Sequence, residues 1–209
     1  GHLRAREHHE EVGPHRAPVD LAQAGDGGGE GLAGDVELDE YRQRFPEHAK
    51  DIKLNLQSVM NDSALSVPQR WGVAVASAIA TGNDELRDAA IADARKAGVD
   101  QKVLDDAAAA AVVMAMNNVY YRFRHMVAKE SYQTKSPRLR MNRIMQPTTT
   151  KVDFELYSLA VSAIHGCEMC VRAHEKAVVD GGITEDQVND TIRIAATFHA
   201  AAQALTAGV

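Results

Sequence analysis

The stretch FELYSLAVSAIHGCEMCVRAHEKAVVDGG, residues 154–182, decides the fold that we expect for this chain. Its spacing of apolar residues predicts two helices, over residues 153–165 and 167–180. Gly166 separates them, and Gly181 with Gly182 ends the second. Glycine adopts the left-handed backbone that ends helices without a steric penalty, so both breaks are well specified.

Helical signals continue on both sides of this stretch. Thr184 and Gln187 have the spacing of a capping box, which predicts a helix over residues 185–205. Asp100 is suited to cap a long helix that runs through an alanine block to Met126 or beyond. Further helices are predicted over residues 37–45, 49–60, 69–81 and 84–97. No run of alternating apolar and polar residues predicts a strand, so the expected fold class is all-α.

Short matches between the two halves of the chain predict an internal repeat. Residues 77–79 match residues 162–164 at an offset of 85, and residues 97–99 match residues 181–183 at an offset of 84. The order and near-constant spacing of these matches favour two related helical halves. At this offset Gly82 and Glu85 stand where the second half has Cys167 and Cys170, so we expect the first half to serve as scaffold.

Composition limits the classes of partner. The 209 residues include 23 Lys and Arg against 29 Asp and Glu, and this net charge of -6 gives no general basic field for nucleic acid. The longest apolar stretch, residues 107–116, is shorter than the roughly 18 to 20 residues of a membrane span. The amino terminus has no hydrophobic signal core. We therefore expect a cytoplasmic protein without nucleic-acid or membrane partners.

The first 35 residues differ in composition from the rest. Residues 1–35 hold eight of the fifteen glycines and four of the nine histidines, with almost no apolar periodicity. We expect a flexible amino-terminal tail or an added extension there, followed by one helical domain over residues 36–209.

The two cysteines of the chain predict a working dithiol. Cys167 and Cys170 are three apart, and no other cysteine is available for a structural framework. At 3.6 residues per turn, positions 167, 170 and 174 lie within about 60° of one another on a helix. The helix amino terminus favours a thiolate, His174 can take or relay a proton, and Glu155 can orient its ring or hold a water.

This set of residues has the chemistry of a thiol peroxidase. A thiolate attacks the O–O bond of a peroxide, and a second thiol condenses the resulting sulfenic acid to a disulfide. Cys170 neighbours His174 and Cys167 should be the more accessible to a reductant, which favours Cys170 as the attacking thiol. The helix amino terminus favours Cys167 instead, so the residues alone leave the order open.

The chain resembles the AhpD-type alkylhydroperoxidases of the carboxymuconolactone decarboxylase-like superfamily. The resemblance covers roughly residues 38–206 and is carried by Glu155, by Cys167-x-x-Cys170-x-x-x-His174, and by the segments AKDIKLNL (49–56), MAMNNVYYR (114–122), LRMN (139–142) and FELYS (154–158). It implies an all-helical fold of two related halves and a homotrimer.

The resemblance also implies an activity and its residues. It implies reduction of alkyl hydroperoxides, with peroxynitrite as a further substrate, by a peroxidatic Cys170, a resolving Cys167 and a proton relay of Glu155 and His174. No bound cofactor or metal is implied, and dihydrolipoyl groups serve as external reductant. The implied partners are a lipoylated acyltransferase, its dihydrolipoamide dehydrogenase and an AhpC-type peroxiredoxin. Some members have a histidine where this chain has Met169, and a carboxylate at Glu168 would raise the thiol pKa unless it points to solvent.

Other interpretations stay open. The dithiol also suits a general thiol-disulfide oxidoreductase, or a non-enzymatic redox sensor or zinc-stabilised module in which His165 and His174 complete a Cys2His2 site. His165 otherwise suits a helix end. Arg138 and Arg140 are solvated or interface charges, or they attract an anionic lipoyl-domain surface. We expect His125 and His199 to be core or interface residues. The helical spacing of Met114, Met116 and Met126 predicts core packing for these three side chains.

Overall fold

A computed structural model describes residues 37–207, and these residues form helices and connections without a strand. The all-α prediction is confirmed for this part of the chain. The expected tail over residues 1–35 lies outside the described residues. Within the described part, no helix has both the length and the apolar character that crossing a membrane requires.

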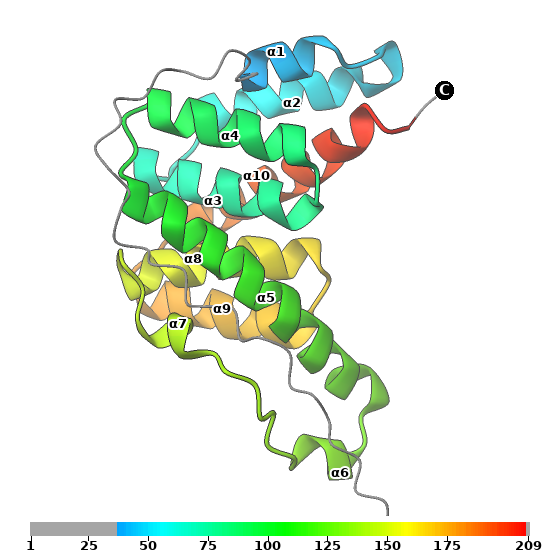
Figure 1. The fold of residues 1–209 in the computed structure, drawn as a ribbon, viewed down its shortest axis with the longest axis vertical. Coiled ribbons are helices and arrows are strands. Elements are labelled where there is room, and N and C mark those ends of the chain that lie inside the picture. The colour runs from blue at the N-terminus through cyan, green and yellow to red at the C-terminus, as the bar shows by residue number, and fades with distance from the viewer. Residues whose placement is uncertain (1–36, 208–209) are drawn as a thin grey trace, which may run out of the picture. The chain divides into compact units, whose positions relative to one another are not determined.

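The described helices follow one another in two sets joined by an irregular connection (Figure 1). The first set is α1 (Leu38–Gln43), the 3-10 helix η1 (Glu47–Ala49), α2 (Lys50–Asn61), α3 (Val67–Thr81), α4 (Asp84–Lys96) and α5 (Gln101–Val127). The connection contains α6 (Glu130–Gln133) and α7 (Asn142–Met145). The second set is α8 (Lys151–Ile164), α9 (Glu168–Asp180) and α10 (Glu185–Ala204).

The predicted helix ends are largely those of the structure, because local capping determines them. Thr184 accepts from the backbone N–H of Gln187 in a complete capping box, and Asp100 accepts from that of Lys102. Ser66 forms a second capping box that begins α3 two residues earlier than predicted. The helices α6 and α7 were not predicted, since each has four residues and no side-chain cap.

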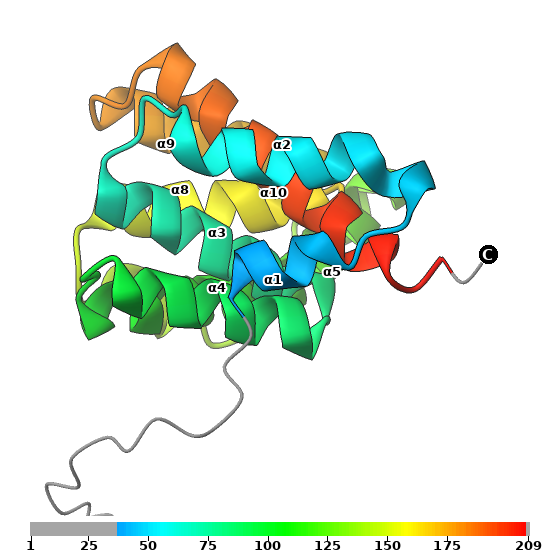
Figure 2. The ribbon, with the colours of Figure 1, turned by 90° about the horizontal axis from the view of Figure 1, so that it is seen from above.

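Helices α3 and α8 form the centre of the core. α3 packs against α4, α5, α8 and α10, and α8 also contacts α5, α9 and α10. Figure 2 shows α2 crossing α10 and α1 beside α4. The first two helices therefore pack against α10 and α4, which themselves contact α3. The two central helices approach closely where Gly72 of α3 faces the ring of Tyr157 of α8.

The two sets repeat one pattern of helix breaks. Gly82 and Gly98 have φ of 72° and 75°, and Gly166 and Gly182, each 84 residues later, have φ of 65° and 95°. This offset places Asn83, rather than Gly82, at the position that corresponds to Cys167. The shift corrects our alignment by one residue, because the left-handed glycines fix the register. The duplication itself stays a prediction.

Three side chains expected in the core or at an interface are exposed. His125 forms an ion pair with Glu168 over 3.1 Å at the surface, His199 is exposed on α10, and Met126 is 75% exposed. These positions lie on the outer faces of α5 and α10, which the periodicity of an alanine-rich helix does not distinguish from inner faces. Met114 of the same series is buried, as expected.

Candidate active site

The turn between α8 and α9 positions both cysteines. Gly166 adopts the left-handed conformation, and the N–H groups of Gly166 and Cys167 donate to the carbonyl oxygens of Ala163 and Ser162, which ends α8. Cys167 is the amino-terminal cap residue of α9, and Cys170 lies in its first turn. This geometry brings the two sulfurs together, and they form a disulfide with their Cα atoms 5.3 Å apart.

Glu155 and His174 form a buried pair beside this disulfide. Glu155 Oε2 of α8 accepts from His174 Nδ1 of α9 over 2.6 Å, and only 11% and 13% of the two side chains are exposed. A carboxylate that accepts from Nδ1–H leaves Nε2 as the ring nitrogen for proton exchange. The structure therefore brings together all four residues that the sequence singled out, and their catalytic roles remain predictions.

Met114 is a further neighbour that sequence reasoning did not assign to the site. Its Sδ lies 3.2 Å from His174 Nε2, and the side chain is buried on α5. Sulfur is a weak hydrogen-bond acceptor, so it can hold the ring without competing strongly for a proton. The contact joins residues 60 positions apart, and no local sequence signal encodes it.

A pocket of about 310 Å³ opens beside Cys170. Its lining is Met114, Asn117, Tyr121, Met141, Ile144, Met169, Cys170, Ala173 and His174. The walls are mainly apolar, and the volume lies at the lower end of the range of about 300 to 1,000 Å³ for small-molecule sites. The pocket therefore suits a small, partly apolar molecule that reaches Cys170.

The accessibility expected for the two cysteines is reversed. Cys167 is 0% exposed and Cys170 is 7% exposed, so Cys170 is the sulfur nearer to solvent. The reason is local, because Cys167 is the buried cap residue of α9 whereas Cys170 lines the pocket. Solvent access therefore does not favour Cys167 as the resolving thiol. The position of Cys170 at the pocket independently favours Cys170 as the attacking thiol.

Glu168, the carboxylate between the cysteines, is engaged at the surface. It pairs with Arg172 over 2.9 Å and with His125 over 3.1 Å, and 52% of its side chain is exposed. The hydrogen bond from Arg172, followed by the charges of Arg172 and His125, lowers the pKa of Glu168. The negative charge of Glu168 is therefore balanced by neighbouring cations on the solvent side. A carboxylate that points to solvent in this way does not raise the pKa of the cysteine thiols.

His165 has a structural role at the end of α8, in line with expectation. Asn118 Nδ2 donates to its Nδ1 over 3.1 Å, and its Nε2 lies 3.4 Å from the carbonyl oxygen of Ala80. Both ring nitrogens are thus occupied away from the disulfide. Within residues 37–207, no group of three or more His, Cys, Asp or Glu side chains is arranged to hold a metal.

Comparison with known proteins assigns the family. The carboxymuconolactone decarboxylase family model matches residues 137–208. A protein of Anaeromyxobacter dehalogenans strain 2CP-1 named alkyl hydroperoxide reductase AhpD is 61% identical over 168 residues, which cover 80% of this chain and 90% of the relative. The chain belongs to the AhpD family. Proteins of the same name from Gluconacetobacter diazotrophicus and Brucella suis are 48% and 45% identical over 81% and 82% of this chain, and over 93% and 98% of their own lengths.

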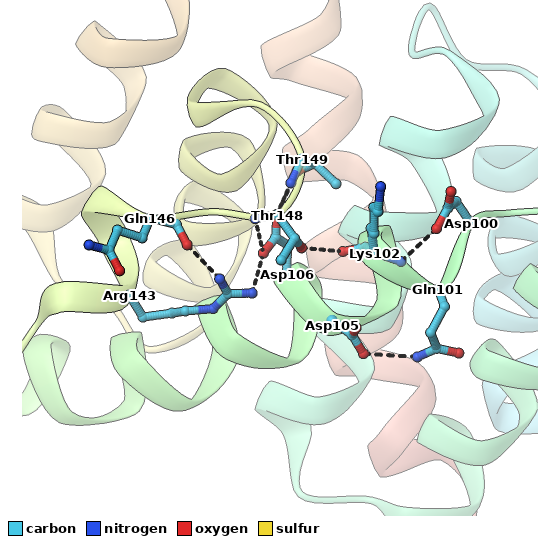
Figure 3. Close-up of polar contacts among 9 residues, drawn as sticks. All are labelled: Asp100, Gln101, Lys102, Asp105, Asp106, Arg143, Gln146, Thr148 and Thr149. Atoms are coloured by element: carbon cyan, nitrogen blue, oxygen red, sulfur yellow. Dashed lines mark hydrogen bonds and ion pairs between the residues drawn. The ribbon is translucent and has the colours of Figure 1, made fainter. Parts of the chain in front are cut away.

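A buried carboxylate on α5 holds the residues that connect α7 to α8 (Figure 3). Asp106 of α5 accepts from Arg143 Nη2 over 2.6 Å, from the backbone N–H groups of Thr148 and Thr149 over 3.0 and 2.7 Å, and from Thr149 Oγ1 over 2.6 Å. Arg143 lies on α7, next to the pocket residue Ile144. Asp106 therefore anchors α7 and the start of α8 to α5.

Proposed function

We propose that this chain is a thiol-dependent peroxidase that reduces alkyl hydroperoxides through a Cys167–Cys170 dithiol and disulfide cycle. The observation that carries the proposal is the disulfide at a small apolar pocket, beside a buried carboxylate–imidazole pair. The name alkyl hydroperoxide reductase AhpD of relatives up to 61% identical supports the same reaction class.

The first half of the proposed cycle consumes the peroxide. The Cys170 thiolate attacks one oxygen of the hydroperoxide, the O–O bond breaks, and the alkoxide takes a proton that His174 supplies through Nε2. Cys170 is oxidised to a sulfenic acid and the peroxide is reduced to an alcohol. The Cys167 thiol then gives up its proton and attacks the Cys170 sulfur as a thiolate, the S–O bond breaks, and the leaving hydroxide takes up that proton, so that one water is released and the disulfide forms. Glu155 holds the ring through Nδ1–H and stabilises its protonated form.

The second half of the cycle restores the dithiol. A dihydrolipoyl group, as external reductant, gives two electrons and two protons through successive thiol–disulfide exchanges and leaves as its cyclic disulfide. Burial of both sulfurs supports this choice, because a slender dithiol can enter the pocket whereas a cysteine on a rigid protein surface cannot. The proposed partners are a lipoylated acyltransferase with its dihydrolipoamide dehydrogenase, and an AhpC-type peroxiredoxin that shares the reductant.

Two finer features belong to the same proposal. Peroxynitrite is a second substrate, since it also offers an O–O bond to the Cys170 thiolate and is small enough for the pocket. The cycle operates in the cytoplasm, where a reducing environment keeps a dithiol available between turnovers.

We also propose a homotrimer. Exposed apolar side chains follow one face of α5 at spacings of three and four residues, and the largest are Val112, Val119, Phe123 and Met126, which are 67%, 61%, 46% and 75% exposed. An apolar stripe of this kind suits packing against helices of other copies. The carboxy-terminal end of α5 extends away from the other helices, where a second copy has access to it (Figure 1).

The alternative functions lack a comparable observation. A general thiol-disulfide oxidoreductase needs a sulfur that large protein substrates can reach, and both sulfurs are buried. A Cys2His2 zinc module needs His165, whose ring is held by Asn118 and Ala80.

Steady-state turnover tests the proposed function. We expect consumption of cumene hydroperoxide that depends on dihydrolipoamide and is abolished in Cys170→Ser. Glu168→Gln, at an exposed position between the cysteines, should retain most of the activity and serves as the control. Absence of turnover in the wild-type protein, or full activity of Cys170→Ser, would contradict the proposal.

A further inference from the structure

A cationic segment lies next to the pocket. The connection over residues 129–140 carries four cations, Lys129, Lys135, Arg138 and Arg140, against one carboxylate, Glu130. All four are exposed, and none forms an ion pair with another described residue. The whole chain has a net charge of -6, so this segment is a local positive region on an acidic protein.

The cationic segment is joined directly to the pocket wall. Arg140 precedes Met141, and Met141 lines the pocket together with Ile144 of α7. Arg138 is three residues from Met141, which bounds the separation of their Cα atoms at about 11 Å. Lys135, Ser136 and Arg138 line a surface hollow of their own. Of the four cations, Arg138 and Arg140 therefore lie nearest to the pocket wall.

This charge does not serve the alkyl hydroperoxide, which is the main substrate that we propose. Alkyl hydroperoxides are neutral, and the pocket that would receive them is mainly apolar. The other molecule that must reach the buried sulfurs is the reductant. Cys167 and Cys170 are 0% and 7% exposed, so a protein can reduce them only by sending a dithiol on a thin arm through the pocket while its own body stays at the rim.

We propose that the cationic segment, residues 129–140, is the docking surface for an acidic protein domain that carries the reducing dithiol on a flexible side chain. The inference rests on the proposed function and names the surface that the reductant's carrier contacts. Positive charge at the rim attracts an acidic domain, and the net negative charge elsewhere on the chain repels it. Both effects raise the rate of encounters in which the arm faces the pocket.

Reduction kinetics with two reductants test the docking surface. One is free dihydrolipoamide, which is neutral, and the other is an acidic lipoyl domain carrying the same group in its reduced form. The test variant is Arg138→Glu/Arg140→Glu. The matched control is Arg95→Glu/Lys151→Glu, which makes the same change in net charge at exposed cations outside the segment.

We expect the test variant to lower kcat/KM for the lipoyl domain about tenfold or more at low salt, as the loss of electrostatic steering does. The difference from wild type should shrink as salt is added. With free dihydrolipoamide, the test variant and wild type should agree within about twofold, because a neutral dithiol gains little from steering.

Several outcomes separate the docking surface from the proposed function. An unchanged kcat/KM for the lipoyl domain in the test variant would overturn the docking surface, as would an equal loss in the control variant. An equal loss with free dihydrolipoamide would overturn it too, by assigning the arginines to the pocket itself. Wild-type protein that neither reductant reduces would instead overturn the proposed function. Tight binding of duplex DNA that the test variant loses, without a change in lipoyl-domain kinetics, would assign the segment to nucleic acid.

Discussion

At the scale of single residues, His174 is the side chain through which the site is organised. Its Nδ1 faces Glu155 and its Nε2 faces Met114, so the ring is held from both sides within α5, α8 and α9. In the relay that we propose, Nδ1–H stays with the carboxylate and Nε2 exchanges the proton. Cys170 and His174 both line the pocket, so the sulfur-bearing residue and the ring border the same space.

Glu155→Gln tests the relay at this scale. The amide keeps the size of the side chain but loses the charge that stabilises protonated His174, so we expect the rate of Cys170 oxidation to fall about 100-fold. Stopped-flow measurement with an alkyl hydroperoxide in excess gives this rate. Glu168→Gln should change it by no more than a few-fold, and equal effects of the two substitutions would remove Glu155 from the relay.

At the scale of helices, caps and close contacts position the site. The glycine after α8 places Cys167 at the cap of α9, and both features were predicted from the sequence because they depend on neighbouring residues. The Asp106 network was not predicted, since it joins α5 to residues about 40 positions later. The same holds for the contact of Met114 with His174. Helix caps and helix breaks can be predicted from neighbouring residues in the sequence. Contacts that form only through tertiary packing cannot be predicted in this way.

Asp106→Asn tests the network that holds α7 and the start of α8. Burial opposes ionisation of Asp106, but the hydrogen bonds from Thr148 and Thr149 outweigh it and lower the pKa of this carboxyl. The amide leaves donors unpaired, so we expect unfolding in urea at pH 7 to show a loss of about 2 to 3 kcal/mol.

The pH dependence of this loss follows from the lowered pKa of Asp106. The carboxylate stabilises the folded state fully above the ordinary aspartate pKa of about 4, and this advantage declines as the pH falls toward the lowered value. The difference in unfolding free energy between wild type and Asp106→Asn should therefore be constant from pH 7 to 5 and shrink below pH 4. A difference that stayed constant at low pH would show that the charge of Asp106 is not responsible.

Gly72→Ala tests the close approach of α3 and α8. A Cβ at this position would overlap the ring of Tyr157, and overpacking of this kind costs about 1 to 3 kcal/mol. The gain of about 1 kcal/mol in helix propensity from Gly to Ala is smaller, so the net effect should be destabilising. The midpoint of thermal unfolding measures this change in stability. In a Tyr157→Leu background the same substitution should be neutral or stabilising, and an unchanged penalty there would contradict the proposed overlap.

At the scale of the whole molecule, the sequence predicted the fold class and the convergence of the four site residues, whereas its apolar periodicity did not separate the buried face of α5 from the exposed one. The α5 stripe illustrates the limit, because Met126 has the spacing of a core residue and is exposed. Periodicity shows that a helix face is apolar, and it does not show whether that face packs within the chain or against another copy.

Val119→Glu/Met126→Glu tests the α5 stripe. Charges in an apolar interface oppose association, so light scattering after size exclusion should give a trimer mass for wild type and a monomer mass for the variant. Circular dichroism should remain that of a folded helical protein, since both side chains are exposed in the single chain. A wild-type monomer, or a variant that remains trimeric, would contradict the proposed assembly.

The proposed cycle depends on the order of the two sulfurs, in which Cys170 reacts with the peroxide and Cys167 resolves the sulfenic acid. Mass spectrometry of Cys167→Ser, treated with one equivalent of alkyl hydroperoxide and a sulfenic-acid trap, tests it most directly. We expect a trapped sulfenic acid on Cys170 in this variant and an intramolecular disulfide in wild type. An unmodified Cys170 in Cys167→Ser, together with a trapped sulfenic acid on Cys167 in Cys170→Ser, would contradict it.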